Sequence, residues 1–279
     1  MIKDITKFDV KLPARERITN KGDAGRVLIV GGNTGMCGAA AFAATSAYRT
    51  GCGLVRAHVH PENRIPMQTL VPECVISLWE DDEYSYIDEC LEWADAVLIG
   101  VGFGKGEYQK RVLKRIIANC KVPLVLDADA LNIISEHPFL LSKLPENTVL
   151  TPHMAELSRL TGVSVEDIKK DVFACLSSHF KNTRASVVAK DSVTSVYVSE
   201  TQRFTCSVGD SSLSTAGTGD VLAGIVVSLL AQKMSVHDAL LSAVYIHGAA
   251  GKSAGERLSQ YSVMARDVIE EIPKIIKEI

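Results

Sequence analysis

The stretch that decides the fold reads AVLIGVGFG, from Ala96 to Gly104. Four apolar residues in succession are typical of a parallel strand that is buried on both faces of a sheet. The glycines that follow predict a sharp turn, because glycine adopts backbone angles that other residues avoid. A helical pattern over Glu107–Ala118 comes next, so the local order is strand, turn and helix.

The same order recurs on both sides of this stretch, with apolar runs that lead into special residues at 26–32, 124–129 and 148–153. Strands that alternate with helices predict a parallel sheet with right-handed crossovers and helices on both faces. We therefore predict one α/β domain over residues 1–279, a three-layer α/β/α fold with a mostly parallel central sheet. Short strands over 185–206 are expected to form antiparallel edge hairpins. Three helices are expected to end the chain: Asp220–Gln232, Val236–Gly255 and Met264–Lys277.

The composition excludes several classes of protein. The 279 residues are 47% hydrophobic and carry a net charge of −3, which excludes a disordered chain and argues against a general nucleic-acid binder. An aromatic content of 6% also argues against a surface that stacks bases. The longest apolar stretch, near Val221–Ala231, is too short to cross a membrane. The first residues do not resemble a signal peptide, and the seven cysteines contain no Cys-x-x-Cys. We expect a cytoplasmic protein with reduced thiols.

The residues that could bind a ligand follow the predicted strands. Glycine, aspartate and histidine stand at four strand ends, in Gly31–Asn33, Gly100–Gly102, Asp127–Asp129 and Thr151–His153. In an open parallel sheet, ligands bind outside the carboxyl ends of the strands. The sequence therefore predicts one shared cleft that is floored by backbone.

A glycine-rich turn in Ala216–Asp220 gives the sharpest local signal. An apolar helix follows it, and the free N–H groups of that helix would form an anion hole suited to phosphate. Asp220 would lie in the first turn of the helix, where its carboxylate could serve as the base for an attacking hydroxyl. The alternative is a glycine-rich loop in which Asp220 acts only as the N-terminal cap.

Other strand-end residues are open to two interpretations. Asp127 and Asp129 could orient Mg²⁺ through water or hold a sugar hydroxyl, although Asp129 could instead cap a helix over Ala130–Ser135. In Thr151–His153, threonine is the expected helix cap and proline the first helical residue, and the histidine could bind a ligand. Lys190 ends a strand and could reach phosphate, or it could be an ordinary surface lysine.

Several other features are not assigned to chemistry. The first glycine segment lacks the spacing of a dinucleotide fingerprint and of a P-loop. His58 and His60 lack a third ligand, so no metal site is predicted at these two histidines. His247 is expected to serve helix packing, and the acidic run Glu80–Glu83 is expected to be a solvated loop.

Taken together, these segments resemble the NAD(P)H-hydrate dehydratase family, the carbohydrate-kinase-like domain of the ribokinase superfold. The motifs that carry the resemblance are Val30–Ala39, Gly100–Gly104, Leu126–Asn132, Leu150–His153, Lys190 and Gly217–Gly224. The resemblance implies a ribokinase-like fold. It also implies nucleotide-driven removal of water from the 6-hydroxy hydrate of NADH or NADPH. Bacterial members typically use ADP and eukaryotic members ATP, and ADP is expected here. The N-terminal epimerase domain of many bacterial members is expected to be absent.

The resemblance also implies roles for individual residues. Asp220 would take the hydroxyl proton, while the amides of Gly217 and Gly219, with Mg²⁺, would hold the transferring phosphoryl group. The expected substrate contacts are Ala39, Gly102, Gly104, His153 and Asp220. The expected nucleotide contacts are Lys190, Asp191, Ser192, Val193, Thr194 and Gly219. Residues that ligate the metal are not assigned. Members of the family suggest a homo-oligomer, specifically a tetramer.

The sequence departs from the usual pattern of this family at Val101, Met154-Ala155, Asp191 and Ala216, and none of these positions holds an expected catalytic group. Two alternatives remain open. One is a small-molecule kinase of the same superfold, of the hydroxymethylpyrimidine or hydroxyethylthiazole kinase type. The other is a nucleotide-binding protein without activity, which the intact Asp220 disfavours.

Overall fold

One mixed sheet forms the centre of the molecule in the computed structural model, which describes residues 2–79 and 84–279. The acidic run Glu80–Glu83 lies outside the described residues. The order of the strands across the sheet is β1-β10-β9-β8-β7-β6-β5-β2-β3-β4. Their bounds are β1 Lys3–Asp4, β2 Arg26–Val30, β3 Leu54–Val59, β4 Val75–Leu78, β5 Ala96–Ile99, β6 Leu124–Leu126, β7 Thr148–Leu150, β8 Ala185–Ala189, β9 Thr194–Ser199 and β10 Gln202–Cys206.

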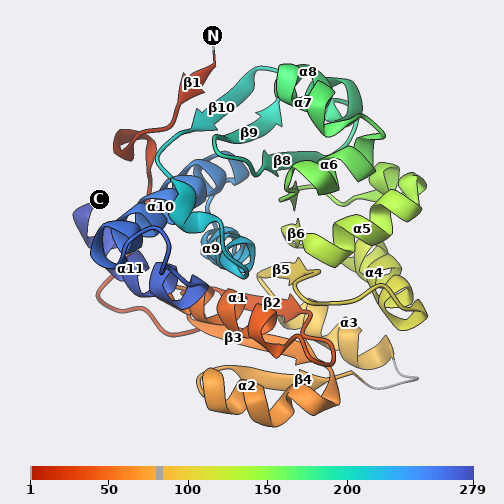
Figure 1. Ribbon diagram of the computed structural model, residues 1–279. Helices are drawn as coiled ribbons and strands as arrows, with labels where there is room; N and C mark the ends of the chain where they lie inside the picture. Colours follow the sequence, from red (N-terminus) through yellow and green to blue (C-terminus); the bar gives the residue numbers. More distant parts are fainter. Residues whose placement is uncertain (1, 80–83) are drawn as a thin grey trace.

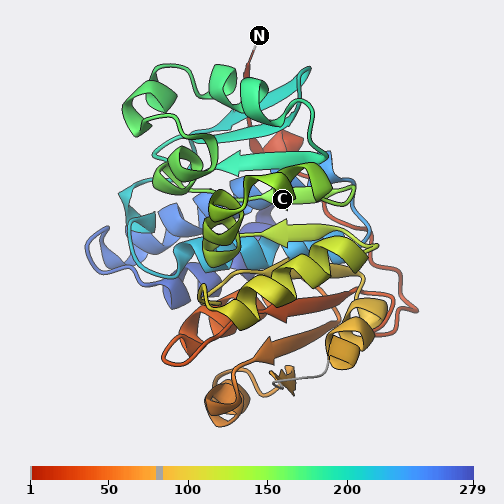
Figure 2. The same ribbon diagram turned by 90° about the vertical axis from the view of Figure 1, so that its right-hand side faces the viewer.

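Helices cover both faces of the sheet, as Figures 1 and 2 show. On one face lie α1 (Cys37–Arg49), α2 (Arg64–Leu70), α9 (Thr218–Ala231), α10 (Val236–Leu258) and α11 (Ala265–Glu278). On the other lie α3 (Tyr84–Trp93), α4 (Glu107–Asn119), α5 (Ala128–Glu136), α6 (Met154–Thr161), α7 (Val165–Lys170) and α8 (Val172–Phe180). The predicted three-layer α/β/α fold is confirmed.

The central strands, such as β2 and β5, are almost wholly apolar because both of their faces are buried. In β2, Val27 and Ile29 join the core under α1 and α9, whereas Leu28 and Val30 join the core under the opposite helices. All four side chains are fully buried. Within the described chain only β9 runs against the other strands, so the sheet is mostly parallel, as predicted.

The strand order reverses between β2 and β5, which places the cleft. From β2 the chain moves outward through β3 to β4, and from β5 it moves the other way through β6, β7 and β8. The helices that follow β2 and β5, α1 and α4, therefore lie on opposite faces of the sheet, and ligands of open α/β sheets bind at such a point. Backbone hydrogen bonds join the loops that leave β2 and β5, from Gly32 N to Val101 O at 3.0 Å and from Asn33 N to Gly102 O at 2.7 Å.

Three details differ from the sequence prediction. β8 pairs in parallel with β7 before it forms a hairpin with β9, and β1 covers the edge of β10. α9 begins at Thr218 and α10 continues to Leu258, because the apolar helical pattern does not mark the ends of a helix. α5 begins at Ala128, so Asp129 lies in the first turn of this helix and is not its cap.

The remaining observations concern the chain as a whole. Six of the seven cysteines are buried, Cys37 is partly exposed, and all are free thiols. Among the described helices, none has the length and apolar character needed to cross a membrane.

Candidate active site

The glycine turn predicted from the sequence is present at the N-terminus of α9, where the expected anion hole would lie. Gly217 has φ of 92° and precedes the first helical residue, Thr218. A Cβ at Gly217 would lie 2.7 Å from Cδ2 of Phe42, so this turn accepts only glycine. No side chain caps the helix, which means that Asp220 is not the cap that the alternative interpretation required. The first amides of α9 therefore remain available to an anion.

An ion pair lies beside this anion hole. Lys190 Nζ is 2.8 Å from Asp127 Oδ1, and the exposed fractions of the two side chains are 20% and 2%. A Cβ at Gly219 would lie 3.3 Å from the same Nζ, so the ammonium lies against the glycine turn. Burial alone lowers the pKa of Lys190, but Asp127 and Glu156 more than offset it and the pKa is raised. Lys190 is therefore a charged residue of the cleft and not a surface lysine.

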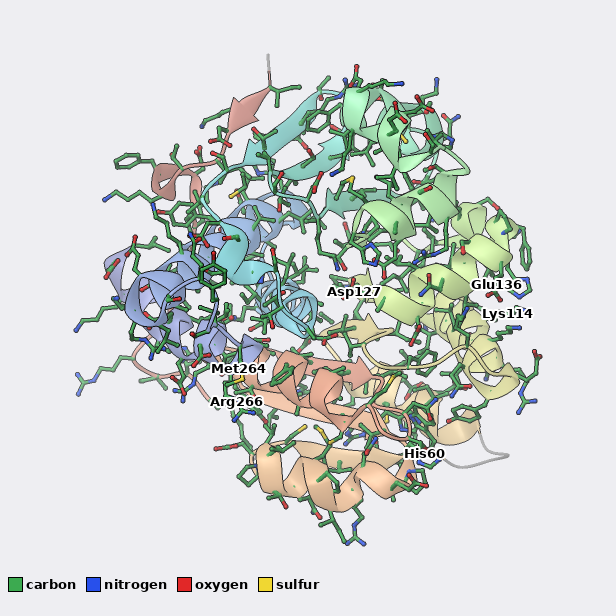
Figure 3. The ribbon with its side chains drawn as sticks, in the orientation of Figure 1. His60, Lys114, Asp127, Glu136, Met264 and Arg266 are labelled. Carbon is green, nitrogen blue, oxygen red and sulfur yellow. The ribbon has the colours of Figure 1, made fainter. Side chains whose placement is uncertain are left out.

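Two further carboxylates face this pair, those of Asp220 and Glu156. Burial, together with the charge of Asp127, raises the pKa of Asp220 from 3.8 to about 7. Burial also raises the pKa of Glu156, although the Lys190 charge opposes that change. The cluster thus holds three carboxylates and one ammonium. In the described residues no group of three or more potential ligands is close enough to hold a metal by side chains alone. Figure 3 labels Asp127, which lies between α9 and α5.

His153 caps α6, a position that the sequence prediction gave to Thr151. Its Nδ1 accepts hydrogen bonds from the N–H groups of Ala155 (3.1 Å) and Glu156 (3.3 Å). In return, Glu156 Oε2 accepts one from His153 N at 2.9 Å. The prediction failed because a histidine ring nitrogen can replace the usual hydroxyl of a capping box. Since Nδ1 is an acceptor, Nε2 carries the proton of the neutral ring.

A cavity of about 400 Å³ opens next to the charged cluster. Its volume lies in the range of small-molecule sites. Five of the expected nucleotide contacts line it: Lys190, Asp191, Ser192, Thr194 and Gly219. His153 lines it as well, whereas Val193 is 44% exposed and is not part of its lining.

The expected substrate contacts Ala39, Gly102 and Gly104 lie outside this lining. Ala39 is in the first turn of α1, and Gly102 and Gly104 are in the turn that follows β5. Gly102 has φ of 55°, and a Cβ there would lie 3.0 Å from Cβ of Ala39, so these two residues are adjacent. Gly104 has φ of 82°, and its N–H donates to Asp129 Oδ2 at 2.7 Å. The fold thus presents two neighbouring regions, a nucleotide-sized cavity and a set of glycine turns, with Asp127 and Asp220 near both.

Sequence reasoning did not place Glu156 in the cluster, and it expected His247 to serve helix packing, which its bond between α10 and α9 bears out. His247 lines the cavity, and its Nε2 donates to the carbonyl oxygen of Thr218 at 2.9 Å. Burial lowers the pKa of His247 to about 4, so the ring is neutral. No local signal identifies it, because the contact joins α10 to α9. Glu156 could have been found from its position three residues after His153, which is the capping-box spacing.

Comparison with known proteins gives one family. A family model described as NAD(P)H-hydrate dehydratase matches residues 27–274. An ADP-dependent (S)-NAD(P)H-hydrate dehydratase from Lactococcus lactis is 34% identical over 272 residues, which are 95% of this chain and 94% of that protein. The chain spans only about half the length of several other curated relatives that it matches.

Solved structures show the same fold. A ribokinase-like superfamily protein from Enterococcus faecalis superposes with a TM-score of 0.90 at 26% identity, covering 99% of this chain and 96% of that one. An ADP/ATP-dependent NAD(P)H-hydrate dehydratase from Bacillus subtilis, co-crystallized with ATP/Mg²⁺, superposes with a TM-score of 0.85 at 24% identity, covering 99% and 98%. The predicted ribokinase-like fold is confirmed.

Proposed function

Because the chain belongs to the NAD(P)H-hydrate dehydratase family, we propose that it removes water from the (S)-hydrates of NADH and NADPH. The reaction is driven by ADP, which is converted to AMP and phosphate, and it restores the damaged nicotinamide cofactor. The observation that carries this proposal is the position of Asp220. It is a carboxylate with a pKa of about 7 in the first turn of α9, and the charges of Lys190, which lines the cavity, and of Asp129, which bonds Gly104, both act on it.

The chemistry follows from the poor leaving ability of hydroxide. Asp220 accepts the proton of the substrate hydroxyl. At the same time the hydroxyl oxygen of the substrate attacks the β-phosphorus of ADP, and AMP leaves. The amides around Gly217 and Gly219, with Lys190, stabilise the charge of the transferring phosphoryl group. The C–O bond then breaks, phosphate leaves with the bonding electrons, and loss of a ring proton restores the double bond. The sum is hydrate plus ADP giving NAD(P)H, AMP and phosphate.

The expected residue roles remain part of this proposal. Substrate is contacted by Ala39, Gly102, Gly104, His153 and Asp220. The nucleotide is contacted by Lys190, Asp191, Ser192, Val193, Thr194 and Gly219. The name of the Lactococcus lactis relative supports ADP as the donor, and the departure at Asp191, on the rim of the cavity, is compatible with either ADP or ATP.

We further propose Mg²⁺ as the cofactor of this reaction. Asp127, Glu156 and Asp220 carry more negative charge than Lys190 balances, which suits a cation. Mg²⁺ commonly keeps several waters and binds one or two carboxylates together with substrate phosphates, so a full set of side-chain ligands is not needed. When bound it would neutralise charge on the phosphates. The Bacillus subtilis relative was co-crystallized with ATP/Mg²⁺.

Residues 1–279 are proposed to act as one catalytic domain in a cytoplasmic homotetramer. Exposed apolar side chains at the β4 edge of the sheet, Ile65, Leu70 and Val75, support an assembly. Light scattering at several protein concentrations measures the mass of the assembly directly, and a monomer at all concentrations would contradict the tetramer.

The activity is tested by mixing purified NADH hydrate with ADP or ATP and MgCl₂ and following the near-ultraviolet absorbance of restored NADH. AMP and phosphate should form in equal amounts with NADH. Asp220→Asn should still bind nucleotide but lose turnover by ~10²–10⁴-fold, because it removes a general base. No restoration with either donor would refute the dehydratase proposal, and a stable phosphorylated product from another alcohol would support the small-molecule kinase instead.

A further inference from the structure

Asp127 and Asp129 belong to one short turn but face different partners. Asp127 Oδ1 pairs with Lys190, whereas Asp129 Oδ2 accepts the N–H of Gly104 at 2.7 Å. Ala128 between them has φ of 46°, a left-handed conformation that non-glycine residues seldom adopt. This conformation directs the carboxylates on its two sides, those of Asp127 and Asp129, to different partners. Such strain persists only where the surrounding structure maintains it.

The turn is fixed against the β5 loop at two points. Besides the bond from Gly104 N to Asp129, Asp129 N donates to Gly100 O at 3.3 Å. A Cβ at Gly100 would lie 1.8 Å from Asp127 O, so the two backbones touch. Asp129 is therefore positioned by the backbone of the loop that carries the expected substrate contacts Gly102 and Gly104.

The second carboxylate oxygen of Asp129 retains acceptor capacity. Its only described side-chain contact is with Asn132 Nδ2, at 3.5 Å, which is the outer limit of a hydrogen bond. The amide oxygen of Asn132 is itself occupied by Arg159 Nε at 2.9 Å, which holds this asparagine in place. An ionised carboxylate offers about four lone-pair sites, and the structure accounts for one strong bond.

Asp129 also lies on the side of the cleft where the reaction is proposed to occur. Its negative charge is one of those that raise the pKa of Asp220, after burial and Asp127. The half of the dinucleotide that carries the reacting ring must contact Asp220, so this is the half that Asp129 can reach. An ionised carboxylate accepts hydrogen bonds from hydroxyl groups, and in dinucleotide-binding α/β folds an acidic residue does so from a ribose hydroxyl.

We propose that Asp129 is a specificity-determining residue for the hydrated dinucleotide. One oxygen holds Gly104, and the other accepts a hydrogen bond from a ribose hydroxyl of the nicotinamide-riboside half of the substrate. This inference rests on the proposed dehydratase function. It differs from a purely structural role, in which Asp129 would only fasten the β5 loop.

The two roles are separated by Asp129→Asn. An asparagine oxygen can still accept the Gly104 N–H, but its amide nitrogen replaces the second acceptor with a donor. For substrate contact we expect the KM for NADH hydrate to rise about 10- to 100-fold, the size expected when a hydrogen bond to a charged group is lost. The KM for ADP and the thermal midpoint should stay near the wild-type values. Glu146→Gln serves as the matched control. Glu146 lies just before β7, at the end of the strands opposite to the cleft, and its carboxylate pairs with Arg184.

Two further measurements distinguish a contact with the substrate from a purely structural role of Asp129. Calorimetry measures the affinity for NADH hydrate in the absence of nucleotide. In Asp129→Asn this affinity should fall by the same factor as the KM for NADH hydrate rises. The hydrate of reduced nicotinamide mononucleotide, which lacks the adenylate half, should show the same loss. Wild-type KM and affinity in Asp129→Asn, with losses only in Asp129→Ala, would assign Asp129 to the loop alone and overturn the proposal. A wild-type protein that binds the hydrate without turnover would refute the dehydratase activity but leave this contact measurable. A wild-type protein that does not bind the hydrate would refute both.

Discussion

Replacing Lys190 by methionine tests whether the charged cluster also stabilises the fold. Methionine keeps the length of the side chain and removes the ammonium, which leaves Asp127 without its partner at 2.8 Å. Asp127 is 2% exposed, so water cannot replace the lost interaction. Glu156 and Asp220 add to the uncompensated charge, since both interact with Lys190.

Breaking a buried ion pair by removing one partner costs ~3–5 kcal/mol. Lys190 is 20% exposed and lies at a cleft, so we expect the lower end, about 3 kcal/mol. For a protein of this size that corresponds to a fall of about 6–12 °C in the thermal midpoint. The measurement is urea and thermal unfolding of the nucleotide-free protein at pH 7, with circular dichroism.

The sign of the pH dependence provides a second check. Because the folded-state pKa of Lys190 lies above 10.5, its contribution is complete at pH 7 and is lost as the pH rises through the folded value. Loss of Lys190 also raises the pKa of Asp220 further, so the difference between wild type and Lys190→Met should grow from pH 7 to about 9 and shrink only in stronger base.

The double variant Asp127→Asn, Lys190→Met serves as the control. It removes both charges, so it should be more stable than Lys190→Met alone by at least ~1 kcal/mol. A loss below about 1 kcal/mol in Lys190→Met, together with additive effects in the double variant, would show that the ion pair does not stabilise the fold and would refute this reasoning.

The other predictions concern turnover and nucleotide binding. The pKa of Asp220 near 7 predicts that kcat/KM falls about tenfold per pH unit below pH 7, as the base becomes protonated; a level profile between pH 5.5 and 8 would contradict its role as the base. Gly217→Ala should weaken ADP binding at least tenfold in calorimetry, because φ of 92° and the close contact with Phe42 exclude a Cβ; unchanged affinity would mean that the turn adapts. His247→Leu should raise the KM for ADP about fivefold by removing the donor to Thr218 O, while His247→Gln, which keeps an N–H donor, should retain most of the affinity; equal losses would show that packing matters and not the hydrogen bond.

Most of the fold could be predicted from local sequence. Continuous apolar runs such as Ala96–Ile99 identify strands that are buried on both faces, and their alternation with helices predicts a parallel sheet. The ends of elements were less predictable, as with α9, which begins at Thr218. A helix end depends on caps and on neighbouring elements, which the apolar pattern does not record.

Some features of the candidate site could likewise be predicted from local sequence, and others depend on the tertiary structure. The glycine turn before Asp220 carries its own signal, because a positive φ and a free helix N-terminus are local properties. The environment of Asp220 is not local, since its raised pKa arises from burial and from Asp127. The sequence therefore proposed Asp220 as the base, and the structure supplies a physical reason, the raised pKa, for the proposal that it acts near neutral pH.

By itself, then, the sequence determined the layer architecture, the glycine turn before α9 and the polar residues at the strand ends. Only the tertiary structure decided which of those residues act together. It pairs Lys190 with Asp127, 63 residues away, and it brings Gly104 to Asp129 and Thr218 to His247 across 25 and 29 residues. The physical reason is that strand order and helix packing create these contacts. A contact between separate elements leaves no periodicity in the chain, whereas a buried strand or a glycine turn records its own constraint in adjacent residues.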